Sequence, residues 1–243
     1  MITRHHVALA LLCSLTLACA AGGFDPFFAL VLAGGTLVGV ILPDIHMKRP
    51  KKNGFLTIGW CIAETGRQIC VPVLSGMYRL FRGSVCEPND KRLTHSVPGF
   101  LVYSLVITAV ILPPALLAEK SIAGSFAMVF LAGTVLGYLL HLLEDLCTRK
   151  GITVFFPYSE QVIRGSIRPC DTADPRIGRF HVTHCLVLGA VAILCVVAQT
   201  PDIRILLGFL GVAACVATMI LQSDVHVMPG KRITPDPGDT AVA

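Results

Sequence analysis

The sequence has few charged residues for its length. Only 14% of its 243 residues are Asp, Glu, Lys or Arg, whereas 54% are hydrophobic, and the mean hydropathy is +0.72. A soluble domain carries about 25% charged residues. Much of the surface of this chain therefore cannot face water, and contact with lipid is the simplest alternative.

The sequence also lacks the cysteine pairs of a thiolate metal site. None of its ten cysteines forms a C-x-x-C pair, which argues against zinc held by sulfur. We expect most of them to be small, buried, reduced side chains. The formal net charge of +5 is modest, and no nucleic-acid partner is expected from it.

Long apolar runs, in contrast, are abundant. A helix that spans a bilayer needs about 20 residues, and six stretches approach or reach this length. They cover residues 7–21, 27–42, 98–118, 122–143, 185–198 and 203–221. The pattern predicts an all-α fold, a polytopic membrane helix bundle of about six spans. The first stretch ends in Ala18-Cys19-Ala20-Ala21 and also resembles a secretory signal peptide, so cleavage there is an alternative.

Positive charge is distributed unevenly between the loops. Every lysine and arginine except Lys120 and Arg204 falls in the two long loops, 44–96 and 148–183, or in the tails. Because basic loops stay in the cytoplasm, both long loops and both termini are predicted there, and the number of spans is even. We expect a multi-pass protein of the plasma or inner cell membrane, in contact with membrane lipid.

Within the first long loop, residues 55–81 are fairly apolar but contain several arginines. We expect one or two interfacial helices there, with Trp60 and Tyr78 at the depth of the lipid headgroups. Residues 1–228 are predicted to form a single membrane-embedded helical domain. Residues 229–243 are rich in Pro, Gly and Asp, which predicts a disordered C-terminal tail.

Three motifs place ionisable side chains where an apolar run meets a cytoplasmic loop. In the first, Asp44 and His46 end the second run, and their spacing points them the same way in an extended segment. In the second, His95 precedes Ser96, which is placed to cap the third helix at its N-terminus. Each of these two motifs alone has an ordinary explanation, as the first polar residues after a span or as a capping segment.

The third motif lies at the end of the fourth run. His141 and Asp145 are four residues apart, so on a helix they share one face. An Asp at the centre of a membrane helix costs on the order of 2.5–3.5 kcal/mol, and less near an end, unless a partner compensates it. A metal ion and a structural His–Asp hydrogen bond both meet that requirement.

Most of the remaining histidines map to the same membrane face. His5 and His6 open the first run, and His181 and His184 precede the fifth. Imidazole and carboxylate ligands suit zinc and other divalent ions, and a catalytic zinc keeps an open position for water. The first-choice metal ligands are Asp44, His46, His95, His141 and Asp145, and the further candidates are His5, His6, His181 and His184. This set is enough for one ion and plausible for two.

The three motifs together resemble those of membrane-bound metal-dependent hydrolases, a family also described as LexA-binding, inner-membrane-associated proteins. The matching residues are Leu42-Pro43-Asp44-Ile45, Thr94-His95-Ser96, and Gly137, Tyr138, His141, Asp145, Thr148, Gly151, Pro157 and Tyr158. That family usually has P-D-I-D-H where this chain has Pro43-Asp44-Ile45-His46-Met47, and H-R-G where it has Asp90-Lys91-Arg92. The resemblance implies metal-dependent hydrolysis, an activity suggested by a distant similarity to zinc-dependent phospholipases C.

The leading hypothesis is a metal-dependent hydrolase that cleaves an ester or phosphoester, lipid included, at the cytoplasmic membrane face. His95, His141 and Asp145 would be catalytic as well as metal-binding, and Ser96 and Thr148 would support them. The first alternative is a non-catalytic scaffold or regulatory protein whose polar cluster is structural. The second is a small transporter, which is disfavoured because a carrier needs its polar groups near the membrane midplane.

Overall fold

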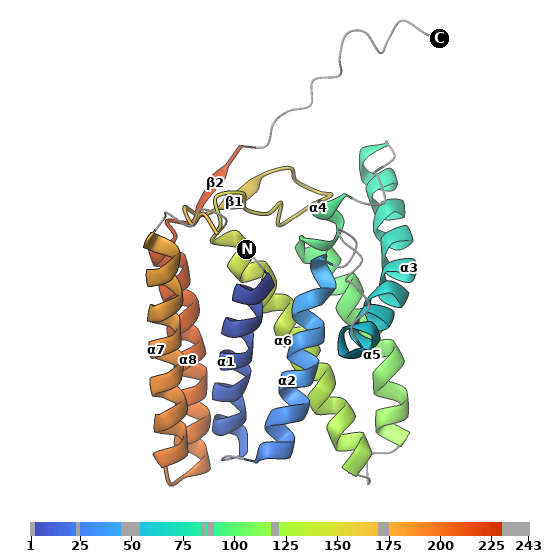
Figure 1. Cartoon of the computed structure of the whole chain (residues 1–243). Helices are drawn as coiled ribbons and strands as arrows, with labels where there is room; N and C mark the ends of the chain where they lie inside the picture. The colour runs from blue at the N-terminus through green and yellow to red at the C-terminus, as the bar shows by residue number, and fades with distance from the viewer. Residues whose placement is uncertain are drawn as a thin grey trace, which may run out of the picture.

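The computed structural model describes residues 3–22, 25–44, 54–83, 86, 90–117, 122–169 and 175–229. Its helices are α1 (Thr3–Gly22), α2 (Pro26–Ile41), α3 (Gly54–Arg82), α4 (Lys91–Thr94), α5 (Val97–Leu117), α6 (Ile122–Leu146), α7 (Pro175–Val197) and α8 (Pro201–Gln222). A 3-10 turn, η1 (Leu42–Asp44), follows α2, and two short strands are β1 (Val162–Arg164) and β2 (His226–Met228). Figure 1 shows the long helices side by side in one bundle. The predicted all-α bundle is confirmed, and the predicted tail beyond Pro229 lies outside the described residues.

Among the described residues, five helices are long and apolar enough to cross a membrane. They cover Pro26–Asp44, Val97–Leu117, Ala123–Leu146, Pro175–Val197 and Pro201–Gln222, and a sixth apolar helix, His5–Ala21, is shorter. Large apolar side chains on α5, α7 and α8 are exposed, among them Leu105, Leu186 and Phe209. Such an outer surface suits lipid better than water. The number of passes and the cytoplasmic location of the termini stay predictions.

Helix α7 begins at Pro175, well before the apolar run that starts at Cys185. His181, which the sequence pattern assigned to the loop 148–183, and His184, which it placed just before the apolar run, therefore both lie on this helix. Apolar composition marks only the part of a helix that suits lipid. The helix itself continues through polar turns, because the hydrogen bonds that hold it run between backbone groups.

Helices α2 and α6 pack along a glycine seam, formed by Gly35 and Gly39 on α2 and by Gly133 and Gly137 on α6. A β-carbon added at any of the four would overlap a backbone carbonyl of the other helix. Small residues four apart let membrane helices approach through their backbones. The seam fixes the ends of α2 and α6 relative to each other, and these ends carry candidate ligands.

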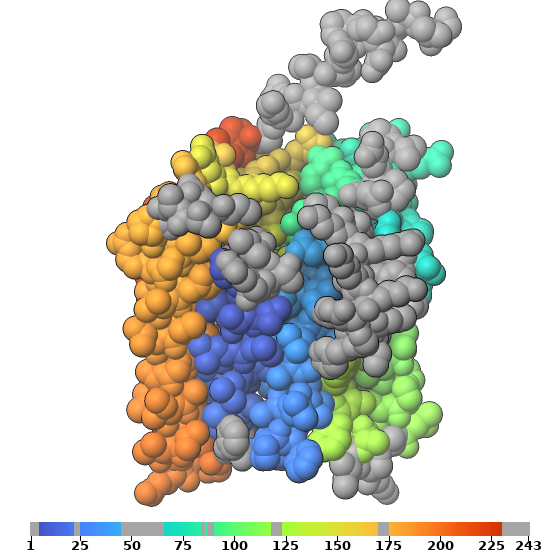
Figure 2. Space-filling model, in the orientation of Figure 1, coloured from blue at the N-terminus to red at the C-terminus, as the bar shows by residue number. Residues whose placement is uncertain are grey.

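Helix α1 lies between α2 and the α7–α8 pair (Figure 1). Figure 2 shows α1 and α2 side by side on one face of the molecule. The side chains of Leu9, Ala10 and Cys13 are buried in a core that also contains Leu188 of α7. This packing holds His6, near the start of α1, against the last turns of α6.

The apolar part of the first long loop forms one continuous helix, α3, which packs against α5. Tyr78 is buried, and its ring stacks on that of Phe156 with the centroids 5.0 Å apart; its predicted position at headgroup depth stays a prediction. The side chain of Trp60 lies outside what the structure describes. The interfacial position of α3 stays a prediction.

A loop layer covers the end of the bundle at which α1 begins (Figure 1). Backbone bridges join Thr148 to Ile167 and Ile152 to Ile163, and β1 pairs antiparallel with β2. Gly151 has a φ of 63°, in the left-handed region that favours glycine, and so allows the chain to reverse after α6. This layer and α4 surround the candidate site.

Candidate metal site

Segments far apart in the sequence bring the candidate ligands together. Helix α6 carries His141 and Asp145 one turn apart, and η1 at the end of α2 carries Asp44. His95 stands between α4 and α5. Ser96 Oγ accepts a hydrogen bond of 3.1 Å from a backbone N–H in the first turn of α5, which is the cap that the sequence predicted.

The ligand atoms of these side chains form a compact group, called here the His95–His141 group. The two Nε2 atoms are 3.2 Å apart, and Asp44 Oδ1 lies 3.3 Å from His95 Nε2. Asp145 Oδ2 lies 3.5 Å from His95 Nε2 and 3.7 Å from His141 Nε2. Atoms bound about 2.0–2.1 Å from a tetrahedral zinc ion lie roughly 3.3 Å from one another. Asp44, His95 and His141 have the spacing of a three-ligand cation site, and Asp145 has that spacing with His6 and His141.

A backbone hydrogen bond orients His95 toward the group. Its Nδ1 lies 3.2 Å from the carbonyl oxygen of Lys91. Because a carbonyl only accepts, the proton of the neutral ring sits on Nδ1, and the lone pair of Nε2 faces the other ligands. Burial lowers the pKa of His95 below its ordinary value, although Asp44 opposes the shift. At neutral pH the ring is therefore in the uncharged form that binds metal ions.

Lys91 provides positive charge at the same place. Its Nζ lies 3.2 Å from Asp44 Oδ1 and 3.4 Å from Asp145 Oδ2. In the sequence, Lys91 looked like one more basic residue of a cytoplasmic loop, and its contacts with the two carboxylates were not predicted. The available signal was its spacing, since a residue four before His95 lies one helical turn away. A bound cation would have to share these carboxylates with Lys91 or displace it.

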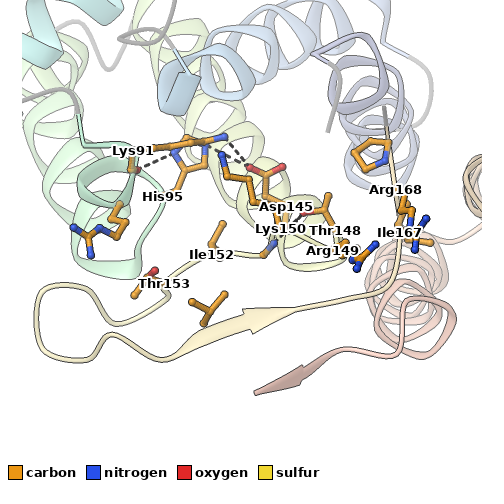
Figure 3. Close-up of a pocket in the computed structure, with 14 residues that line it drawn as sticks. Lys91, His95, Asp145, Thr148, Arg149, Lys150, Ile152, Thr153, Ile167 and Arg168 are labelled. Carbon is orange, nitrogen blue, oxygen red and sulfur yellow. Dashed lines mark hydrogen bonds and ion pairs between the residues drawn. The ribbon is translucent and has the colours of Figure 1, made fainter. Parts of the chain in front are cut away.

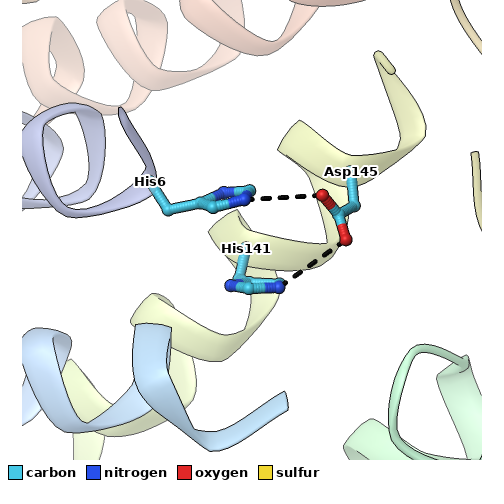
Figure 4. A group of neighbouring side chains, drawn as sticks. All are labelled: His6, His141 and Asp145. Atoms are coloured by element: carbon cyan, nitrogen blue, oxygen red, sulfur yellow. Dashed lines mark ion pairs between the residues drawn. The ribbon is translucent and has the colours of Figure 1, made fainter. Parts of the chain in front are cut away.

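A second group lies toward α1. It consists of His6 and the carboxylates of Glu144 and Asp145, and it is called here the His6 pair because His6 contacts both carboxylates. His6 is fully buried, and its ring stacks on that of His141 with the centroids 4.1 Å apart. Its Nδ1 lies 3.0 Å from Glu144 Oε2, and its Nε2 lies 3.4 Å from Asp145 Oδ1. Figure 4 shows His6, His141 and Asp145 converging. Asp145 thus presents one oxygen to each group, as a carboxylate that bridges two cations does.

Glu144 was also overlooked in the sequence. It is fully buried and faces His6. A carboxylate that contacts one nitrogen of an imidazole ring leaves the other nitrogen free to bind a metal ion, so Glu144 would support His6 as a ligand. A second carboxylate beside Asp145 in an otherwise apolar helix was the available signal.

The comparisons with known proteins agree with the membrane fold. The model of the YdjM inner membrane protein family matches residues 1–225. The chain belongs to this family. No curated protein and no solved structure matches the chain. For this YdjM family member, the family and the apolar helices together support an inner membrane location. The family description names a location and no reaction.

Other predicted residues of the YdjM family member lie beside the two groups. His5 faces His181, with ring centroids 4.4 Å apart. His184 is buried, and its Nδ1 donates to the carbonyl of Phe180. Among the described residues, none of these three histidines is part of a cluster with metal-ligand spacing. His46 lies outside the described residues.

Thr148 and Asp44 lie in turns where their helices end. Thr148 Oγ1 donates to the carbonyl of Asp145 (2.8 Å) and accepts from the N–H of Gly151 (3.2 Å), so it stabilises the turn after α6. Asp44 lies in a 3-10 turn and not in the predicted extended segment. The physical reason is Pro43, whose fixed φ is compatible with continued helical winding.

A cavity of about 780 Å³ opens beside the His95–His141 group (Figure 3). Its walls come from α4, from the end of α6 and from the covering loop layer. His95 and Asp145 line it, so an ion held by the group could be reached from the cavity. The basic residues of its lining are Lys91, Arg92, Arg149, Lys150 and Arg168.

Proposed function

We propose that the chain is a divalent-metal-dependent hydrolase of the inner membrane, with zinc as the ion and an ester or phosphoester as the substrate. The observation that carries the proposal is the gathering of the candidate ligands into two overlapping groups with metal-ligand spacing, Asp44–His95–His141 and His6–His141–Asp145. The resemblance of the motifs to membrane-bound metal-dependent hydrolases points to the same chemistry. The two-sided position of Asp145 supports a second ion on the side of His6.

When bound, the ion lowers the pKa of a water molecule and polarises the bond under attack. The residues of the chain supply the proton acceptor. Asp145 lines the cavity, and its Oδ1 is 3.4 Å from His6 Nε2. When no second ion occupies the side of His6, a proton that Asp145 takes from the attacking water can pass to His6 Nε2, and Glu144, 3.0 Å from His6 Nδ1, stabilises the charged imidazole.

The depth of the site favours a substrate at the membrane surface. Asp44 ends the apolar segment Pro26–Asp44, and Asp145 lies at the end of Ala123–Leu146. A lipid presents its ester or phosphoester bonds where the hydrocarbon core meets the headgroups. We therefore include membrane lipid in the substrate class. The charge bias of the loops assigns this end of the bundle to the cytoplasm.

A non-catalytic scaffold or regulator is the second candidate. Lys91 favours it, because its contacts with Asp44 and Asp145 compensate both carboxylates without an ion. In that case the polar cluster holds helices together, and added zinc changes nothing. A transporter is disfavoured, since the group lies at one end of the bundle and a carrier needs its site near the midplane.

Metal analysis of the purified protein tests the proposal. Plasma mass spectrometry should find about one or two zinc ions per wild-type chain, and His141→Ala should lose most of them. His226→Ala is the matched control, because His226 is exposed on β2 and stands outside both ligand groups. Wild-type protein without stoichiometric metal would overturn the proposal.

The reaction itself is tested with a short-chain chromogenic phosphodiester and the corresponding carboxylic ester. The wild-type protein should hydrolyse one of them, a chelator should abolish the activity, and zinc should restore it. The His226→Ala control should keep the activity and His141→Ala should lose it. Equal rates in these two variants would contradict the assignment of the site.

A further inference from the structure

The cavity beside the metal group has strongly basic walls. Five of its lining side chains are cationic, whereas Asp145 is the only carboxylate among the described residues that line it. The basic residues come from two places, with Lys91 and Arg92 on α4 and Arg149, Lys150 and Arg168 on the covering loop layer. This excess of positive charge indicates an anionic ligand.

The backbone holds the basic wall of the covering layer in place. The turn that begins at Thr148 and reverses at Gly151 carries Arg149 and Lys150. The N–H of Arg149 donates to the carbonyl of Ile167 (2.8 Å), which holds the segment of Arg168 beside this turn. Figure 3 shows these side chains around the same cavity as Asp145 and His95. Their position follows from the turn and not only from the basic composition of a cytoplasmic loop.

The cations of the cavity differ in how they are already neutralised. Lys91 is paired with Asp44 and Asp145. Arg92 is paired with Asp90, at 2.6 Å, and its guanidinium lies over the ring of Phe156. Arg149 and Lys150, in contrast, are exposed.

No acidic partner of Arg149 or Lys150 is found within the part of the chain that the structure describes. Their charges are therefore available to a ligand in the cavity. Arginine binds phosphate through paired N–H groups, and lysine binds it as a point charge. A cavity of about 780 Å³ falls in the range of ligand sites, which span about 300–1,000 Å³.

We propose that Arg149 and Lys150, with Arg168 beside them, form a phosphate-binding subsite that holds the substrate next to the metal group. The inference rests on the proposed hydrolase function and narrows its substrate to molecules that carry a phosphate. The phosphate belongs to a lipid headgroup or to a soluble phosphoester, and both present the same anionic oxygens to the cavity.

Calorimetric titration of the purified full chain in detergent tests the subsite. The probes are inorganic phosphate and short-chain phosphatidic acid, with short-chain phosphatidylcholine as the lipid of equal chain length and no net charge. The variant Arg149→Gln/Lys150→Gln should bind both anionic probes about tenfold more weakly than the wild type. The charge-retaining variant Arg149→Lys/Lys150→Arg should stay close to the wild type.

The matched control is Arg79→Gln/Arg179→Gln. Both residues are exposed arginines that do not line the cavity, and the double change removes the same charge. This control should bind both probes like the wild type. Equal weakening in the two double glutamine variants would show a general charge effect and overturn the subsite, and so would unchanged binding in Arg149→Gln/Lys150→Gln.

The relative affinities of the two probes and the zinc content of the variant distinguish the remaining alternatives. If phosphatidic acid binds more tightly than inorganic phosphate through these two residues, the source is a lipid, and equal affinities indicate a soluble phosphoester. The zinc content of Arg149→Gln/Lys150→Gln should equal that of the wild type. Should the wild type hold no zinc and still bind phosphate through Arg149 and Lys150, the hydrolase proposal fails and the subsite remains.

Discussion

His95 and His141 face each other through their Nε2 atoms, which are 3.2 Å apart although the residues lie on different helical segments. Two neutral imidazoles at this distance either share one proton or share one cation. The Nδ1 proton of His95 is committed to a backbone carbonyl, so its Nε2 is an acceptor. A cation between the rings satisfies both nitrogens, together with the carboxylates of Asp44 and Asp145.

Replacing Glu144 with Gln should weaken metal binding without removing a ligand. Glu144 Oε2 holds His6 Nδ1 at 3.0 Å, and the loss of such a supporting carboxylate lowers metal affinity about 10–100-fold. Competition with a fluorescent zinc chelator measures the affinity. Glu160→Gln should leave it unchanged, since Glu160 contacts neither group. An unchanged affinity in Glu144→Gln would argue against His6 as a ligand.

Replacing Lys91 with Gln separates the metal site from the structural cluster. The change removes the Lys91 contacts of Asp44 and Asp145, and the loss of a partner of a buried polar group costs about 1–3 kcal/mol. We expect a lower Tm in chelator, and a Tm that zinc restores to or above the wild-type value. Zinc affinity should rise, because the ion no longer competes with Nζ. A Tm that falls and does not respond to zinc supports the scaffold alternative.

Replacing Gly137 with Ala should damage the fold through the glycine seam. The added β-carbon would overlap the carbonyl of Thr36, and overpacking typically costs about 1–3 kcal/mol. Gly189→Ala on α7 is the matched control, because nothing lies within 4 Å of its added β-carbon. Thermal unfolding in detergent should show a lower Tm for Gly137→Ala alone. Equal Tm values for the two variants would mean that α2 and α6 separate easily.

The pH dependence of stability should include a contribution from Asp90. Burial raises the pKa of Asp90, but the hydrogen bonds and charge of Arg92 outweigh this effect, so the pKa lies below its ordinary value. A depressed pKa stabilises the folded state above the unfolded pKa of about 3.9, and the contribution is lost as the pH falls through the folded pKa.

The test compares the Tm of the wild type and of Asp90→Asn between pH 7 and pH 3. Asp90→Asn should start with a lower Tm at pH 7 and lose less of it on acidification. Asp202→Asn is the control, because Asp202 is exposed at the start of α8, at the other end of the bundle. Parallel curves for the wild type and Asp90→Asn would show that the Asp90–Arg92 pair contributes nothing.

The membrane bundle could be predicted from the sequence because its signals are local. Each apolar run lies within a helix of the structure. The predicted positions of the helix ends were less accurate: α7 begins at Pro175 and continues through polar turns before its apolar run. The spacing of His141 and Asp145 likewise fixes a shared face within one helix. The order of the motifs suggested one site, and Asp44 and His95 do lie beside that face.

The rest of the site could not be predicted, because it depends on which helices become neighbours. Glu144 has a partner only because α1 packs against α6 and brings His6 to it. Lys91 reaches two carboxylates only because the end of α2 lies between α4 and α6. The basic wall of the cavity requires the turn after α6 to fold back through Gly151. The sequence marks Lys91 and Glu144 as unusual by their positions, but it does not say which side chains of other helices they meet.

The glycine seam has a consequence for which ion the group could hold. Two helices whose backbones touch cannot slide or spread without losing their packing, so the distance between the ends of α2 and α6 is nearly fixed before any ion arrives. A rigid frame of this kind favours a small ion with short bonds and four ligands over calcium, which needs six to eight oxygen ligands at 2.3–2.6 Å. The packing of α2 against α6 would thus favour ions of small radius over larger ones.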